Sequence, residues 1–221
     1  MKNTIKTLIF IASLFIFLGL FVVIGRLFID LPSYYTTAAG LAAFLLALGV
    51  QGLLKHIYII PRIKSHVVLM SFPVKTIMLK DRLTAAIIPF FAVFSSWFYS
   101  KPASETIIPS VTVFVIFLIL LEILLKFGES TMKIYFTSIG VGVSGYDFRP
   151  EFTLPFTANN LPGIYEYDRI VHFISKEDSI VLTQYFDSNK LIVKAAEEDL
   201  KKIVGLLTSK KILPEKYQGL N

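Results

Sequence analysis

The residue best placed to do chemistry in this sequence is Glu122, a carboxylate in the otherwise uncharged run from Ile107 to Leu125. A charge at the centre of a membrane helix costs roughly 2.5 to 3.5 kcal/mol, so an intramembrane carboxylate is a candidate for an ion or proton path. Lys126 follows four residues later, the spacing at which opposite charges pair on one helix face. The pair Glu122 and Lys126 is therefore a candidate polar site, with three roles open: ion pairing near the interface, an ion path, or a helix-packing contact.

A glycine-rich motif runs from Gly140 to Gly145 and satisfies GxGxxG. A dinucleotide fingerprint needs a helix to begin there, and Tyr-Asp-Phe-Arg-Pro follows instead. The sequence also contains neither GxSxG nor a Walker motif. We therefore predict no cofactor-binding site.

The remaining titratable residues do not form a recognisable catalytic or metal-binding pattern. The three histidines, His56, His66 and His172, are scattered without the spacing of a metal site. Glu166 and Asp168 have the spacing of one strand face, where solvated or ion-paired carboxylates are far commoner than catalytic pairs. We predict no catalytic residue, no metal ligand and no enzymatic activity.

The composition is that of an integral membrane protein. Hydrophobic residues make up 54% of the 221 residues, and the mean hydropathy is +0.66. The net charge of +6 is uneven: residues 1–126 hold 11 Lys/Arg and 4 Asp/Glu, while 127–221 hold 11 and 12. The positive charge thus belongs to membrane orientation, and no nucleic-acid partner is expected. The absence of cysteine excludes disulfides and zinc-cysteine sites.

Four apolar runs are long enough to cross a hydrocarbon core of about 30 Å. We predict spans at about 7–25, 34–60, 83–100 and 107–126, with Pro61 closing the second. The first is longer than a signal-peptide core, which indicates a retained helix. Small residues recur every four positions in the second span, at Ala39, Ala43 and Ala47. Such a face allows close approach of another helix, from this chain, a protein partner or a second copy.

The connection between the second and third spans carries the most positive charge. Its basic residues are Arg62, Lys64, Lys75, Lys80 and Arg82, against Arg26 in the first connection and Lys101 in the third. The positive-inside rule places this connection and both termini in the cytoplasm. Apolar residues alternate with these cations, so the segment could lie on the inner membrane surface, with the cations on anionic lipid headgroups, or pack beneath the cytoplasmic domain.

Beyond Gly128 the pattern changes to short β-rich runs. We predict strands at 132–137, 152–156, 164–175, 179–186 and 191–195, with a four-residue turn at 187–190. An amphipathic helix follows, with Ala196, Leu200, Ile203, Val204 and Leu207 on one face. Together these elements predict a small barrel at residues 129–214, closed by a helical plug, with residues 215–221 as a tail.

The order "YFTSIGVGV", "IYEYDRIVHF", "SIVLTQYFDSNKLIVKA" and "EEDLKKIVGLL" resembles the bacterial pleckstrin-homology-like domains that occur fused to transmembrane helices. In that family an early strand leads to glycine-marked turns, a strand with an aromatic-x-x-Asp-x-Ile pattern, a hairpin and a closing helix. The resemblance covers residues 131–210, and the proline-containing segment FRPEFTLPFTANNLPG departs from it. It implies a partly open barrel that binds partners or lipids without catalysis.

The expected protein is thus a membrane α-helical bundle of four transmembrane helices, residues 1–128, followed by a small α+β domain. Its expected function is non-enzymatic: the cytoplasmic domain would bind a protein or a lipid headgroup, and the resemblance allows a role in bacteriocin or toxin immunity. A transporter accessory subunit or small carrier, and a structural subunit of an envelope complex, remain as alternatives.

Overall fold

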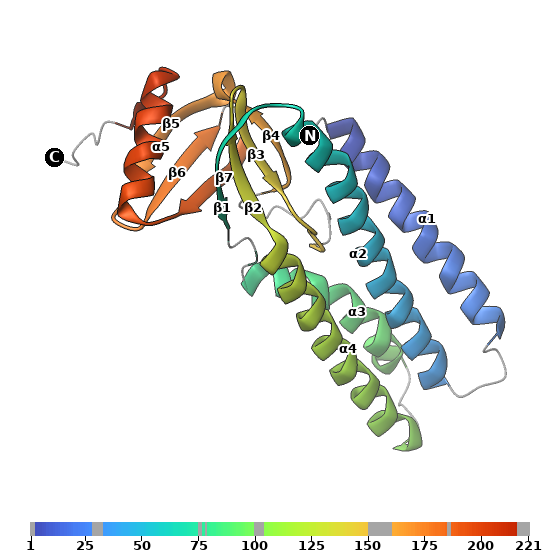
Figure 1. Cartoon of the computed structure of the whole chain (residues 1–221). Helices are drawn as coiled ribbons and strands as arrows, with labels where there is room; N and C mark the ends of the chain where they lie inside the picture. The colour runs from blue at the N-terminus through green and yellow to red at the C-terminus, as the bar shows by residue number, and fades with distance from the viewer. Residues whose placement is uncertain are drawn as a thin grey trace.

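The computed structural model describes residues 3–27, 33–74, 77, 79–99, 104–149, 161–184 and 187–215. Helices form the N-terminal half and a strand-rich region follows (Figure 1). The four long helices are α1 (Asn3–Leu27), α2 (Ser33–Lys64), α3 (Leu79–Tyr99) and α4 (Ser104–Thr131). Helix α2 packs between α1 and α4, and α3 packs against α4.

Two of these helices, α2 and α4, are long and apolar enough to cross a membrane. The apolar stretch of α1, Leu8–Ile24, is shorter. The prediction that Pro61 ends the second helix was wrong, because α2 continues to Lys64. The added turn packs against the strand-rich region: Ile63 is fully buried, and a Cβ placed on Gly142 would lie 2.8 Å from its Cδ1.

The small-residue face of α2 is largely used within the chain. Ala43 and Ala47 are buried, and Ala39 is half-buried. Nearby, the rings of Phe17 on α1 and Phe44 on α2 meet edge to face with centroids 6.2 Å apart. This face is therefore an intramolecular helix contact over most of its length.

The strands form two four-stranded sheets. The first has the order β1 (Val68–Pro73), β2 (Lys133–Thr137), β3 (Gly140–Ser144), β4 (Gly163–Glu166) and is antiparallel throughout. The second has the order β7 (Asp187–Lys194), β6 (Ser179–Gln184), β5 (Ile170–Ser175), β8 (Leu213–Pro214). Among the strand pairs of the described residues, the β5–β8 pair alone is parallel. Within the described residues the sheets do not close into a barrel, so a closed barrel is not the architecture.

Strand β1 was not predicted. It comes from the basic connection between α2 and α3, and it pairs with β2 so that Phe72 lies opposite Ile134. Backbone pairing explains why the apolar residues of this connection do not form a solvated loop. Two arrangements were left open for this connection: lying on the membrane surface or packing on the domain that follows the helices. The β1 part of it packs on the strand-rich region.

Gly140 and Gly142, which the family resemblance would place at turns, lie instead within β3. A Cβ on Gly140 would lie 2.3 Å from the Tyr165 carbonyl oxygen of β4, and Gly142 faces Ile63 of α2. The turn itself falls at Ser138 and Ile139. These glycines therefore permit close backbone approach rather than reversal of the chain.

The predicted strand 164–175 is divided. It contains β4, a 3-10 turn at Tyr167–Arg169 and β5, and so passes from the first sheet to the second. Glu166 ends β4 and Asp168 lies in the turn, so the two carboxylates do not share a strand face as predicted. The predicted 187–190 turn was also misplaced, since β7 begins at Asp187. The predicted strand at 152–156 lies outside the described residues.

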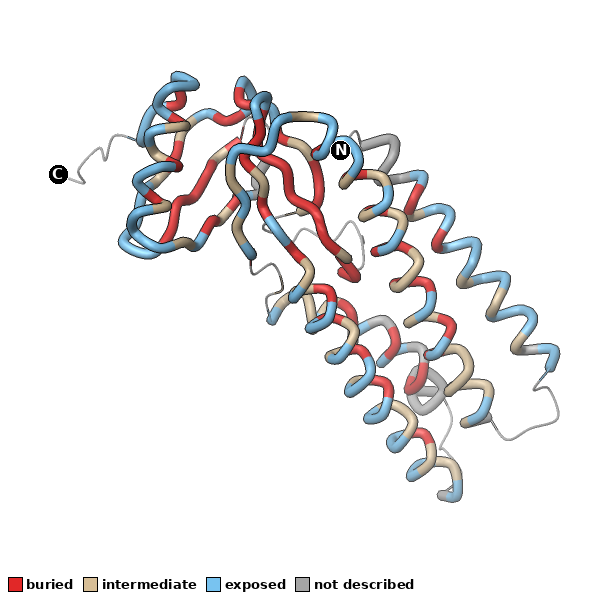
Figure 2. The backbone as a smooth tube through the Cα atoms, viewed as in Figure 1, coloured by how far each residue is buried: buried red, intermediate tan, exposed pale blue. Residues whose placement is uncertain are grey.

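The C-terminal helix α5 (Glu197–Ser209) confirms the sequence prediction. Leu200, Ile203 and Leu207 are buried in the core of the strand-rich region, which also contains Phe136 and Phe173. Figure 2 shows buried residues on the sheets and on one side of α5. The helix face that was predicted to close the barrel therefore packs on the sheets.

Candidate functional site

The segment Tyr146–Arg149, directly after β3, lies against both α2 and α4. A Cβ on Gly52 of α2 would lie 2.5 Å from a ring carbon of Phe148, and a Cβ on Gly128 of α4 would lie 2.5 Å from the Tyr146 carbonyl oxygen. Both contacts are too close for any other residue without rearrangement. Glycines on two separate helices thus let this segment join the helices to the strands.

A cluster of buried charges lies at this joint. Arg149 Nε donates to Asp147 Oδ1 at 2.7 Å, and an Arg149 terminal nitrogen donates to Asp147 Oδ2 at 3.1 Å. Lys55 Nζ of α2 lies 3.6 Å from Asp147 Oδ2. The three side chains are 1 to 4% exposed. We call Lys55, Asp147 and Arg149 the ionic joint.

Neighbouring polar groups complete the ionic joint. Gln51 Nε2 donates to the Arg149 carbonyl oxygen at 2.9 Å, and Lys55 Nζ donates to the Asp147 carbonyl oxygen at 3.5 Å. Asp81, at the start of α3, adds an electrostatic attraction to Arg149. The joint therefore draws groups from α2, α3 and the segment after β3.

Burial alone would raise the pKa of the Asp147 carboxyl. The positive charges of Arg149 and Lys55, with the hydrogen bonds from Arg149, outweigh this effect and hold that pKa below its ordinary value. Burial would likewise lower the pKa of Arg149, but the Asp147 charge and hydrogen bond raise it. Asp147 therefore stays ionised at neutral pH and is suited to holding the cations rather than to transferring a proton.

Sequence reasoning missed the ionic joint. In the sequence, Lys55 is a residue near the end of a span, and Asp147 is part of a segment that rules out a nucleotide-binding helix. They are 92 residues apart. A weak signal was present in Tyr-Asp-Phe-Arg, where charged and aromatic residues alternate beside a glycine-rich strand.

The candidate carboxylate Glu122 is held by two cations. Lys126 Nζ lies 3.7 Å from Oε1, as the four-residue spacing suggested, and Arg82 Nε of α3 lies 3.0 Å from Oε2. The Glu122 side chain is 36% exposed, so the group is neither deeply buried nor lacking charge partners. This geometry is typical of an ion-pair contact between α3 and α4 rather than of a residue on an ion path.

We expect Glu122→Gln to have a small effect on stability. Partly exposed ion pairs contribute about 0 to 1 kcal/mol, and the amide keeps the size of the carboxylate and an oxygen that can accept a hydrogen bond. Thermal unfolding of the purified chain in detergent, with its level in the membrane, measures the effect. Loss of the folded protein would show that Glu122 contributes more to stability than these ion pairs do.

The proposed headgroup cations do not form one cluster. Arg62 lies over the Tyr58 ring, 3.7 Å from its centroid, and Lys64 is exposed at the end of α2. Lys80 and Arg82 lie at the start of α3, where Arg82 is engaged by Glu122. Lys75 lies outside the described residues. Lys64 and Arg62 thus lie apart from the α3 cations in the sequence and in the fold.

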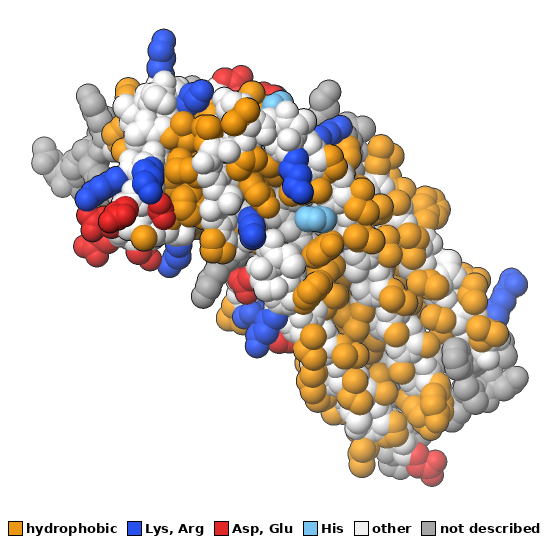
Figure 3. All heavy atoms as spheres, viewed as in Figure 1, with side chains coloured by type: hydrophobic (Ala, Val, Ile, Leu, Met, Phe, Trp, Pro, Cys, Tyr) orange, Lys and Arg blue, Asp and Glu red, His pale blue; other side chains and the backbone are white. Residues whose placement is uncertain are grey.

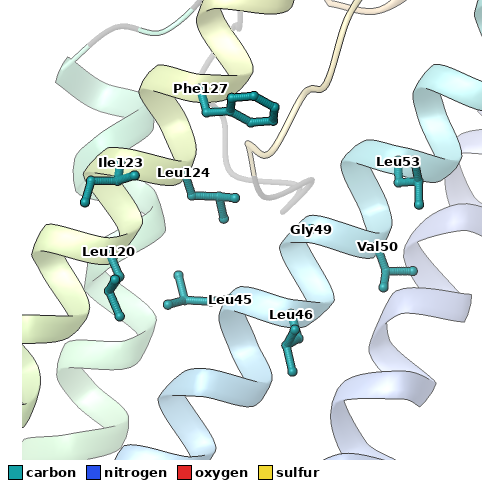
Figure 4. A pocket seen from close by; sticks show the side chains of 9 residues that line it. All are labelled: Leu45, Leu46, Gly49, Val50, Leu53, Leu120, Ile123, Leu124 and Phe127. Carbon is teal, nitrogen blue, oxygen red and sulfur yellow. The ribbon is translucent and has the colours of Figure 1, made fainter.

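An apolar groove of about 550 Å³ lies between α2 and α4 (Figure 4). Its walls are Leu45, Leu46, Gly49, Val50, Leu53, Leu120, Ile123, Leu124 and Phe127. Phe127 stacks on Tyr146 at 5.9 Å, and Tyr146 stacks on Phe148 at 6.1 Å. These rings connect the groove to the ionic joint.

His56 lies beside the same rings. Its imidazole centroid is 4.6 Å from that of Tyr146, and its Nδ1 is 3.4 Å from Ser144 Oγ. The other histidines lie elsewhere, with His172 Nε2 3.4 Å from Glu215 on the second sheet. In the part of the chain that the structure describes, no three His, Asp or Glu residues gather in a way that could hold a metal ion.

No protein-family model, curated protein or solved structure matches this chain. The class that the geometry itself defines is a chain with an α-helical N-terminal half, including two helices able to span a membrane, and a strand-rich C-terminal half. The features of the molecule that bear on its function are the surface of the helices, the ionic joint and the groove.

Proposed function

We propose that this chain is a multi-pass, non-enzymatic protein of the cell membrane. In this proposal, four helices anchor a cytoplasmic pleckstrin-homology-like domain that binds a protein or a lipid headgroup. Toxin immunity is one role that such a protein could serve. The observation that carries the proposal is the continuous apolar surface of the helices (Figure 3).

Each of the four helices exposes large apolar side chains. Exposed examples are Phe15 of α1, Leu46 of α2, Leu83 of α3 and Ile108 of α4, the last at 75%. Soluble monomers rarely expose a contiguous apolar surface of this extent, whereas helices in lipid require it. This supports membrane insertion of α1 and α3 together with α2 and α4.

The spacing of polar and charged residues supports the same arrangement. On α2, Lys55 follows Tyr34 by 21 residues, and on α4, Lys126 follows Glu105 by 21 residues. At about 1.5 Å per residue, each interval is about 32 Å long, close to a hydrocarbon core of about 30 Å. Lys55 and Lys126 would then lie near the same membrane surface, on the side of the strands.

Coupling of the two halves supports a binding role. The ionic joint and the Gly52 and Gly128 contacts hold the strands directly on the helices. A domain attached in this way is presented at a defined height above the membrane. Such presentation suits recognition of headgroups or of another membrane protein.

Cysteine labelling tests the orientation. We expect an impermeant thiol reagent to label Ser104→Cys in intact cells and Ser71→Cys only after permeabilisation, because the basic connection should be cytoplasmic. The natural chain has no cysteine, so no background site needs removal. Ser71 is exposed on β1, which makes its protection in intact cells informative. Labelling of Ser71→Cys in intact cells would overturn the orientation.

A transport role is the main alternative, and it makes a different prediction for Glu122. An ion path would use the carboxylate charge, so Glu122→Gln would abolish activity at normal membrane levels. The contacts of Glu122 with both Arg82 and Lys126 favour an anchoring role instead. A structural subunit of an envelope complex would be distinguished by stable co-purification of other subunits.

A further inference from the structure

We propose that the groove between α2 and α4 binds one anionic phospholipid of the surrounding bilayer. Its acyl chain lies along the groove, and its phosphate meets a basic mouth formed by His56, Lys64 and Lys133. This inference rests on the membrane insertion proposed above and adds a ligand class and a site to it.

The groove suits an acyl chain. All nine residues that line it are apolar or glycine, and its α2 wall runs from Leu45 to Leu53. About eight residues of helix rise about 12 Å, most of one hydrocarbon leaflet of about 15 Å. In Figure 4 Leu45 and Leu124 lie between the two helices, and Phe127 lies at the end nearest the strands. A chain lying there would run from the headgroup level toward the bilayer centre.

The groove is short for a partner helix. Its α2 wall covers only Leu45 to Leu53, whereas a helix packed on this face would contact most of the length of α2 and α4. The length of the groove therefore favours a lipid chain over a second copy of the chain.

The mouth of the groove is basic. His56 is one turn beyond Leu53 on α2, and Lys64 is at the end of the same helix. Lys133 of β2 is the register partner of Ser144, whose hydroxyl contacts His56. Register partners in an antiparallel pair point to the same sheet face, so Lys133 extends on the His56 side.

The mouth cations are accessible to an anion. Lys64 and Lys133 are exposed, and neither has an ion-pair partner among the described residues. Figure 3 shows Lys and Arg side chains and a histidine just beyond the apolar face of the helices. An apolar groove that ends in cations of this kind is complementary to a lipid with a negative phosphate and a neutral chain.

Filling the groove tests the chain site. A Cβ placed on Gly49 would have no atom within 4 Å, and Gly49 lines the groove, so Gly49→Phe would place its ring in the groove. Gly19 of α1 has equally open space and lies away from the groove, which makes Gly19→Phe the matched control. We expect Gly49→Phe to weaken phosphatidylglycerol binding at least about tenfold and Gly19→Phe to leave it unchanged. Titration of the full chain in detergent, followed by native mass spectrometry, measures binding.

Removing a mouth cation tests the headgroup site. We expect Lys133→Gln to reduce phosphatidylglycerol binding about three- to tenfold with little effect on phosphatidylcholine. Lys176→Gln is the control, since Lys176 is exposed on the connection between β5 and β6. Equal binding of the two lipids by the natural chain would overturn headgroup recognition.

The outcomes separate this inference from the proposed function. If Gly49→Phe inserts normally, as judged by Ser71→Cys and Ser104→Cys labelling, and still binds phosphatidylglycerol as tightly, the groove is not the site and membrane insertion stands. If Gly49→Phe converts a dimer to a monomer, a second copy is the occupant and the lipid site is wrong. Failure of the natural chain to insert would refute both.

Discussion

Replacing Asp147 by alanine should destabilise the protein by about 3 to 5 kcal/mol. The change removes the anion between Lys55 and Arg149 and leaves two cations that are almost fully buried. An uncompensated buried charge carries a penalty of this size, which is a large part of the roughly 5 to 15 kcal/mol that stabilises a typical domain. Thermal unfolding of the full chain in detergent, followed by circular dichroism, measures the loss.

The matched control is Asp178→Ala. Asp178 Oδ2 also accepts from a lysine, Lys194, at 3.0 Å, but both side chains are well exposed. Asp178→Ala should cost much less than Asp147→Ala, because water replaces the exposed lysine pair and only the neutral Ser179 hydroxyl loses an acceptor. Equal losses for the two variants would show that the burial of the ionic joint has no energetic consequence.

The ionic joint also predicts the pH dependence of stability. Because the pKa of Asp147 is lower in the folded chain than in the unfolded one, its contribution is fully present above the ordinary aspartate pKa of about 4. The contribution should be constant between about pH 5 and 8, should decrease as pH drops below about 4, and should be lost once pH has passed through the depressed folded value. Asp147→Ala should remove this acid dependence.

Elements with local periodicity could be predicted from the sequence. Helix α5 was predicted with its buried face because Leu200, Ile203 and Leu207 repeat at helical spacing after an acidic first turn. The apolar runs of α2 and α4 were predicted because length and hydropathy are local properties. Such features depend on near neighbours in the chain, which a sequence displays directly.

Features that depend on distant residues could not be predicted. Strand β1 lies between two apolar helices, and only its partner β2, far later in the chain, gives it a strand role. The glycines of β3 have the appearance of turn residues in the sequence, because their need for close approach comes from Tyr165 and Ile63. The ionic joint was missed for the same reason, since Lys55 and Asp147 meet only in the folded chain.

Replacing Ile203 by alanine should have the second-largest effect. It should lower the free energy of unfolding of the strand-rich region by about 2 to 5 kcal/mol. Ile203 is fully buried between α5 and the sheets, so its truncation loses apolar burial and leaves a cavity. Ile139→Ala is the matched control, because Ile139 is 40% exposed at the β2–β3 turn and should cost less than about 0.5 kcal/mol. Circular dichroism melts of the full chain compare the two.

The site of the loss distinguishes Ile203 from Asp147. Ile203 belongs to the hydrophobic core of the strand-rich region, so Ile203→Ala should increase amide hydrogen exchange in β5, β6 and α5 while α2 and α4 stay protected. Asp147 is bound to Lys55 of α2, so Asp147→Ala should increase exchange both in β3 and in the part of α2 around Lys55. If Ile203→Ala instead increased amide hydrogen exchange in α2 and α4 to the same degree, the two halves would unfold as one cooperative unit. The anchoring and binding roles proposed for them would then not correspond to separately stable parts of the chain.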